Sequence, residues 1–132
     1  MRERIPDMAK AQSLVEASTQ EMKYIEKLEV TEESAATIIS RIYECFRRLG
    51  EALLVLQGLD DADHEASINA LINLHVKSTS PVQVLSNLRE QRHNINYKGF
   101  IPSITDLEDV ISMKKTLWKP ILEEVKRRLS QS

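Results

Sequence analysis

The chain has 132 residues, 42% of them hydrophobic and 29% charged, which matches one globular domain that we expect to span residues 1–132. Its three Gly and four Pro are too few for the many turns of a β-sandwich or barrel, so we expect an all-α protein with an aliphatic core. A formal net charge of −2 excludes a globally basic nucleic-acid binder.

The N-terminal half predicts two long amphipathic helices. The first should begin near Pro6, which suits the first helical position, and its apolar stripe is Met8, Ala11, Val15, Met22, Ile25 and Leu28. Thr31 breaks this stripe and should be the N-cap of a second helix that runs to about Gln57. That helix has a seven-residue apolar rhythm: Ala35, Ile38, Ile42, Phe46, Leu49, Leu53 and Leu56. Gly58 should end it in the left-handed conformation.

Two shorter helices should follow. A third helix is expected over about residues 64–76, after a polar connection at residues 59–63. Ser80 and Pro81 suit the N-cap and the first position of a fourth helix. That helix should cover about residues 81–96, because a glycine and a proline follow it closely.

The last helix begins at a predicted capping box formed by Thr105 and Glu108. Its apolar positions are Leu107, Val110, Leu117, Ile121, Val125 and Leu129. Pro120 lies inside it and should kink or split it at about Lys119. Long helices joined by brief links predict an up-and-down bundle of about five helices.

The cysteine content and the apolar runs restrict the setting of the protein. Cys45 is the only cysteine, which excludes an intrachain disulfide and a cysteine-based zinc site, and its place beside Phe46 predicts a small core residue. No apolar run approaches the roughly 20 residues of a membrane span. The N-terminus also lacks the apolar stretch of a signal peptide. We therefore expect a soluble, cytoplasmic protein that does not bind membranes.

Charge is unevenly distributed along the chain. Residues 1–65 hold 8 basic and 14 acidic side chains, whereas residues 66–132 hold 10 basic and 6 acidic ones. Halves of opposite sign can steer an anionic ligand toward one side of a protein. The alternative is that they are solvated helix faces of different sign.

The stretch with the most chemistry is residues 88–99, LREQRHNINYKG. At about 100° per residue, five polar side chains fall within about 140° of one helix face: Arg89, Arg92, His93, Asn96 and Tyr97. The opposite positions, Val84, Leu88 and Ile95, should face the core. Arginine matches phosphate oxygens, histidine moves protons near neutral pH, and tyrosine stacks on bases. This flank suits a phosphodiester; the alternative is an ordinary solvated helix face.

Over about residues 35–128, the chain resembles the HEPN superfamily of small all-helical nucleotide-binding domains. Many members are metal-independent RNases of toxin–antitoxin pairs or anti-phage systems. The family signature is an arginine, usually followed by a polar residue, with a histidine after about four to six intervening residues. Arg92 and His93 match the arginine and its neighbour, and Tyr97 stands where the histidine is expected. The sequences ALL at 52–54 and HEA at 64–66, with Gly58 between them, also resemble the family.

The resemblance implies that the protein binds RNA or a nucleotide as a homodimer, with two copies of the helix face across a shared cleft. In a cleavage reaction Arg92 would hold the phosphate and His93 or Tyr97 would move the proton, without a metal or other cofactor. Arg89 and Asn96 would assist binding. Tyrosine, with an ordinary pKa near 10, is a weaker base than histidine at neutral pH. One alternative is a non-catalytic helical module that partners a small nucleotidyltransferase, and another is a scaffold without a nucleic-acid role.

The remaining polar residues predict structural roles. His64 should cap or pack against a helix, and His75 should lie near the C-terminal end of the third helix, where an imidazole suits the helix dipole. Four acidic residues lack the spacing of a calcium loop and predict a solvated turn: Asp60, Asp61, Asp63 and Glu65. Two ion pairs at four-residue spacing are expected on the second helix: Arg47–Glu51 and Arg48–Glu44.

Overall fold

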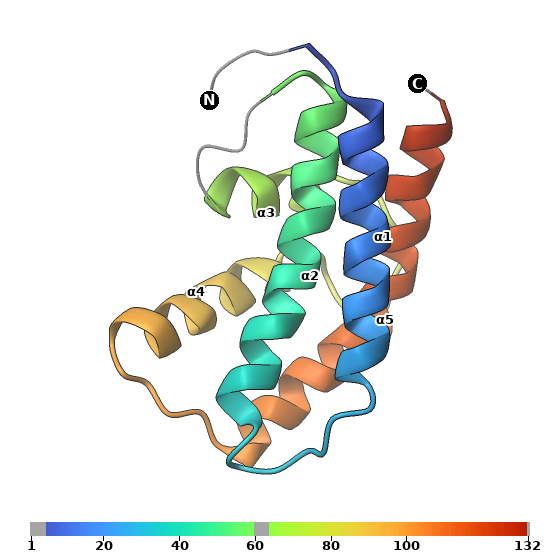
Figure 1. Ribbon diagram of the computed structural model, residues 1–132. Coiled ribbons are helices and arrows are strands. Elements are labelled where there is room, and N and C mark those ends of the chain that lie inside the picture. Colours follow the sequence, from blue (N-terminus) through green and yellow to red (C-terminus); the bar gives the residue numbers. More distant parts are fainter. Residues whose placement is uncertain (1–4, 60–63, 132) are drawn as a thin grey trace.

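Five helices make up most of residues 5–59 and 64–131, which are the residues that the computed structural model describes (Figure 1). The helices are α1 (Met8–Ile25), α2 (Ala35–Leu56), α3 (His64–Ile72), α4 (Val84–Tyr97) and α5 (Ile104–Ser130). The predicted all-α bundle is therefore confirmed. In Figure 1, α1 and α2 run antiparallel and α5 rises beside α1, while the shorter α3 and α4 project to the other side of α2. No helix among these residues is long and apolar enough to cross a membrane.

The centre of the bundle is α2, which packs against each of the other four helices. Because neighbours cover it on several sides, its buried residues extend beyond the predicted apolar rhythm to Ile39, Tyr43 and Gly50. Phe46 is fully buried and meets Trp118 of α5 edge-to-face, with ring centroids 5.2 Å apart. The predicted apolar stripe of the last helix is buried at every position that the sequence singled out.

Gly50 allows α3 to approach α2 closely. A Cβ atom at this position would lie 1.9 Å from the backbone oxygen of Ser67 in α3, far inside van der Waals contact. Glycine normally weakens a helix interior by about 1 kcal/mol relative to alanine. Here the missing side chain sets the separation of α2 and α3, and α3 in turn packs on α4.

The two ends of α2 differ in how well the sequence predicted them. Gly58 has φ +76°, and the Leu59 N–H donates to the Leu54 carbonyl at 2.8 Å, which confirms the left-handed helix end. At the other end the expected N-cap, Thr31, is wrong, because α2 starts at Ala35 after Ser34. Thr31 and Ser34 each accept a hydrogen bond from the other's backbone N–H, at 3.0 and 3.1 Å, and this closes a turn before the helix.

Two other predicted helix limits are wrong by a few residues. α1 begins after Asp7, not at Pro6, because the Asp7 carboxylate accepts a hydrogen bond from the Lys10 N–H at 3.0 Å. α3 ends at Ile72, so His75 lies beyond the helix and not at its C-terminal end. The predicted start of this helix at residue 64 is correct. The polar connection at residues 60–63 and the side chain of His64 lie outside the described structure.

The start of α4 also differs from the prediction. Pro81 lies in a turn, and the helix begins only at Val84. Ser80 does not cap it, because the Ser80 hydroxyl bonds to the Thr116 hydroxyl of α5 at 2.7 Å. The Ser80 hydroxyl therefore bonds to a distant residue, Thr116, and not to the backbone N–H groups at the start of α4. At the other end, Gly99 has φ +66° and stops the helix as expected.

The capping box of α5 lies two residues before the predicted one. Ser103 and Asp106 form it, with side-chain-to-backbone distances of 2.9 and 3.1 Å, in place of Thr105 and Glu108. The helix is not split at Lys119 but continues through Pro120 to its end. Figure 1 shows α5 crossing obliquely under α2 and then turning upward beside α1, so the helix bends without breaking.

Candidate functional site

The candidate site lies on the side of α4 that the helical periodicity predicted. Leu88 and, in addition, Leu85 are buried toward the core, and Val84 and Ile95 are half-buried against it. The polar residues occupy the rest of the helix surface. Two of them are half-buried, Arg89 and Arg92, and three are exposed: His93, Asn96 and Tyr97. We call these five residues the α4 patch.

Arg92 has a defined orientation within the α4 patch. With its amide oxygen turned toward the guanidinium, Asn96 accepts hydrogen bonds from Arg92 Nε and Nη2 at 3.0 and 3.1 Å. The Arg92 guanidinium carbon also lies 5.4 Å from the ring centroid of Tyr43 on α2, a cation–π distance. A guanidinium has five N–H groups, so three remain beyond the two that face Asn96. Arg92 is therefore positioned by two neutral groups, the Asn96 carboxamide and the Tyr43 ring, and neither of them carries a charge that balances the guanidinium.

The exposed end of the α4 patch carries a pair of aromatic rings. The His93 and Tyr97 rings are 4.9 Å apart and tilted by 40°, as neighbours one helical turn apart can be. The Tyr97 side chain is prominent, since the residue is 70% exposed. Exposed rings of this kind are the groups on which proteins stack unpaired bases.

Tyr43 is the member of this region that the sequence did not reveal. It is 1% exposed, and burial raises the pKa of its phenol to about 12, against the opposing charges of Arg92, Arg47 and Arg89. The phenol therefore stays neutral at physiological pH, with three guanidinium groups near it. Its position four residues before Arg47 could have drawn attention to it, but its contact with α4 is long-range and has no local sequence signal.

Arg47, which lies beside Tyr43, is paired with two carboxylates of its own helix. It forms ion pairs with Glu44 at 2.6 Å and Glu51 at 3.0 Å, and Arg48 lies 3.7 Å from Glu44. Both predicted pairs at four-residue spacing are confirmed. Burial alone would lower the pKa of Arg47, but the bonds and charges of the two glutamates outweigh it and raise the pKa above its ordinary value. Arg47 therefore faces Tyr43 as part of a compensated network.

The other chemical candidates do not form a site among the described residues. Burial raises the pKa of the Cys45 thiol to about 12, so the thiol stays protonated in the core, as predicted. His75 is exposed and lies outside any helix. Within residues 5–59 and 64–131, no group of three or more His, Cys, Asp or Glu side chains is arranged to hold a metal ion.

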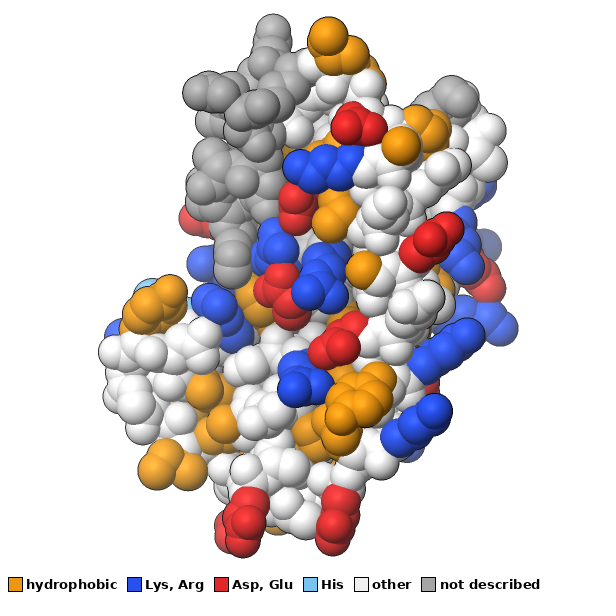
Figure 2. Space-filling view, in the orientation of Figure 1, with side chains coloured by type: hydrophobic (Ala, Val, Ile, Leu, Met, Phe, Trp, Pro, Cys, Tyr) orange, Lys and Arg blue, Asp and Glu red, His pale blue; other side chains and the backbone are white. Residues whose placement is uncertain are grey.

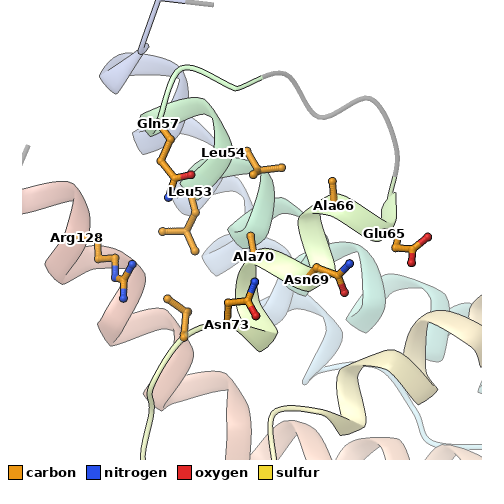
Figure 3. Close-up of a pocket in the computed structure, with 10 residues that line it drawn as sticks. Leu53, Leu54, Gln57, Glu65, Ala66, Asn69, Ala70, Asn73 and Arg128 are labelled. Atoms are coloured by element: carbon orange, nitrogen blue, oxygen red, sulfur yellow. The ribbon is translucent and has the colours of Figure 1, made fainter. Parts of the chain in front are cut away.

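A separate hollow that the sequence did not suggest lies between the ends of α2 and α5 and the length of α3 (Figure 3). It has a volume of about 450 Å³. Three carboxamides and one guanidinium supply most of its polar groups: Gln57, Asn69, Asn73 and Arg128. Arg128 is held by Glu124 at 3.0 Å. The carboxamides can both donate and accept hydrogen bonds. Because the lining comes from three separate segments of the chain, no sequence motif predicted the hollow.

The molecular surface shows how charge and apolar groups are distributed. Acidic and basic side chains are interspersed over α1 and α2 on the face in Figure 2, so the opposite charges of the two sequence halves do not divide this face in two. Hydrophobic side chains are visible over α4 and its connection to α5 at the lower left (Figure 2). The exposed ones in this segment are Tyr97, Phe100, Ile101 and Ile104.

Comparisons with known proteins add no relative. No known family profile matches the chain, and no curated protein sequence and no solved structure is detectably similar to it.

Proposed function

We propose that this protein is an HEPN-like domain that binds RNA or a nucleotide through the α4 patch. The observation that carries the proposal is the arrangement around Arg92. Its guanidinium is oriented by Asn96 and Tyr43 and lies on the same helix face as the exposed His93–Tyr97 ring pair. A preorganised cation beside a stacking surface suits a ligand that joins a phosphate to a base.

Each part of the ligand has a matching group in the patch. The phosphate takes up the remaining N–H groups of Arg92, and Arg89, one turn earlier, adds a second positive charge. A base stacks on the outer face of the Tyr97 ring, because this residue is 70% exposed. Single-stranded RNA is favoured over a duplex, because only unpaired bases can leave their stack to reach such a ring.

The same arrangement supports a metal-independent RNase of toxin–antitoxin or defence type. Arg92 stabilises the charge on the phosphate while His93 or Tyr97 takes the proton of the attacking ribose hydroxyl. The ribose oxygen then bonds to phosphorus, the bond from phosphorus to the oxygen of the next nucleotide breaks, and that leaving oxygen takes a proton from water. His93 is the stronger candidate for the base, since an imidazole changes charge near neutral pH and a phenol does not. His93 follows Arg92 directly in the sequence, and the Tyr97 ring lies 4.9 Å from the His93 ring, which supports a shared role for the two groups.

Binding is tested by fluorescence anisotropy with a labelled single-stranded RNA, with AMP and GMP as competitors. Arg92→Ala should weaken RNA binding about tenfold or more, the loss expected for charge-assisted hydrogen bonds. Arg127→Ala is the matched control, because Arg127 pairs with Glu124 on α5 and lies outside the patch. Equal affinities of wild type and Arg92→Ala would contradict the proposal.

Cleavage is tested with the same RNA in EDTA, which removes any contribution from divalent metals. Tyr97→Phe separates the two roles of the tyrosine, since it keeps the ring and removes the hydroxyl. If His93 is the base, Tyr97→Phe should cleave like the wild type and His93→Ala should be inactive. Absence of cleavage by the wild type at high protein concentration would leave binding as the function and contradict the RNase.

The proposal includes a homodimer in which two α4 patches share one RNA-binding cleft. Light scattering of the purified protein measures this directly. A dimer that persists at the concentrations of the binding assay is expected, and a monomer that still binds RNA would show that one patch is sufficient.

A second candidate is a non-catalytic module that partners a small nucleotidyltransferase. The observation that favours it is the run of exposed hydrophobic side chains after α4, in which Ile101 is 86% exposed. Large exposed apolar groups that are close in sequence are typical of protein interfaces. Co-expression with a nucleotidyltransferase encoded by an adjacent gene, followed by size-exclusion chromatography, should give a complex that Ile101→Asp disrupts. A co-purified complex that withstands this substitution would contradict the role of this surface.

A further inference from the structure

A smaller hollow lies where the end of α1 and the first halves of α2 and α5 meet. Its volume is about 240 Å³. Most of its wall is aliphatic: Ile25, Leu28, Val30, Ile38, Ile42 and Ile111. Glu26, Lys114 and Lys115 complete the lining. A cavity of about 150 Å³ holds a benzene-sized molecule, so this hollow has room for a chain of roughly eight carbon atoms.

Lys114 is the unusual residue of this pocket. It is only 8% exposed, and its Nζ donates to Glu26 Oε2 at 3.0 Å. A buried ammonium is costly unless an anion pairs with it. Glu26 is its partner, but the Glu26 side chain is 55% exposed and can therefore turn into water at little cost. An anionic ligand could take its place on Lys114.

The charges around the pocket select the kind of ligand. Two lysines and one glutamate line it, so its walls carry a net positive charge. An aliphatic wall next to a buried ammonium matches a molecule with an alkyl chain and an anionic head. A cation would be repelled, and a neutral alcohol would gain only the apolar contacts.

We propose that this pocket binds a small alkyl carboxylate. The chain lies against the isoleucines of α1 and α2, and the carboxylate accepts the hydrogen bond of Lys114 in place of Glu26. This site is on a different part of the bundle from the α4 patch, and it does not depend on RNA binding.

Isothermal titration calorimetry with three probes tests the proposal. Octanoate supplies both the chain and the charge, octanol supplies the chain alone, and acetate supplies the charge alone. Octanoate should bind, octanol should bind at least about tenfold more weakly, and acetate should give no heat of binding. Equal binding of octanoate and octanol, or no octanoate binding at millimolar concentration, would overturn the proposal.

Two substitutions with opposite expected effects strengthen the test. Lys114→Met keeps the apolar stem and should reduce octanoate affinity about tenfold or more. Glu26→Gln removes the internal competitor and should increase the affinity several-fold. Since Lys114→Met could unfold the chain, the gain in Glu26→Gln keeps the proposal testable, and unchanged affinity in Glu26→Gln would contradict it. Lys119→Met and Glu123→Gln are the controls, because they change an exposed lysine–glutamate pair of α5 outside this pocket.

Discussion

Arg47 and Arg92 lie on two helices near the same buried phenol, Tyr43, but are held in opposite ways. Arg47 is bound by two carboxylates of its own helix, Glu44 and Glu51. Arg92 is oriented by a carboxamide and by the face of the Tyr43 ring. Among the described residues no carboxylate pairs with Arg92. The charge of the first arginine is compensated within the bundle, and we propose that the charge of the second serves a ligand.

The two arginines also differ in how far along the chain their partners lie. The ion pairs of Arg47 with Glu44 and Glu51 lie within α2 and should survive a shift between helices, although Glu51 also lies 3.8 Å from Lys10 of α1. The Arg92–Tyr43 contact joins α4 to α2, so it depends on how α2, α3 and α4 pack. Substitutions that move helices should disturb the second arrangement and leave the first intact.

The largest effect is expected from Gly50→Ala. The new Cβ would lie 1.9 Å from the Ser67 backbone oxygen, so α3 must move away from α2. We expect a loss of about 3 kcal/mol in the free energy of unfolding, measured by urea denaturation, although alanine normally favours a helix. RNA affinity should fall as well, because α4 packs on α3. A variant as stable as the wild type would show that α2 and α3 are not in this close contact.

Alkaline pH should destabilise the folded protein through the buried thiol of Cys45. In the folded protein the pKa of Cys45 is about 12, whereas the exposed thiol of the unfolded chain ionises near pH 9. The unfolded state loses this proton first, so stability should fall as the pH rises from about 9 to 12, by about 2–3 kcal/mol at pH 11. Thermal unfolding of Cys45→Ala should show a smaller loss over this range. An identical pH profile for both proteins would contradict the raised pKa.

Arg47→Met should lower stability and leave RNA binding nearly unchanged. Removing the guanidinium leaves Glu44 and Glu51 partly buried without their main partner, which costs about 2 kcal/mol. Urea denaturation measures the loss, and anisotropy measures RNA affinity at a temperature where the variant is folded. Arg48→Met is a suitable comparison, because within the described part of the chain the ion pair of Arg48 is a longer contact with Glu44, at 3.7 Å. A larger loss of affinity than of stability would place Arg47 in the binding site.

The smallest effect should come from Tyr43→Phe. The ring beneath Arg92 is kept, so RNA affinity should change less than about twofold. Tyr43→Leu removes the ring and should weaken RNA binding several-fold, since the cation–π contact contributes about 0.5–1 kcal/mol or more. If the two variants bind RNA equally, the ring does not position Arg92.

Local patterns predicted most of the fold and part of the geometry of the candidate site. The apolar spacing located all five helices, and four-residue spacing predicted the pairs of Arg47 and Arg48 as well as the shared face of His93 and Tyr97. The true N-caps of α1, α2 and α5 are residues close to the predicted ones, whereas the missed start of α4 has a long-range cause. Ser80 bonds to Thr116 of α5 instead of capping α4.

The features without any local signal are those that join different helices. In the sequence, Gly50 is only a residue of low helix propensity, and its role becomes clear once α3 is packed against it. Tyr43 looks like one more core residue until α4 brings Arg92 over its ring. The pairing of Lys114 with Glu26 spans 88 residues and could not be foreseen from spacing.

The most direct test compares Arg92→Met and Arg47→Met in parallel, with RNA affinity and the free energy of unfolding measured for each. Arg92→Met should lose RNA binding about tenfold or more with little change in stability, and Arg47→Met should lose stability with little change in binding. If Arg92→Met binds RNA as the wild type does, or if both variants lose affinity only in proportion to their stability, Arg92 is a structural residue and the α4 patch is not the binding site.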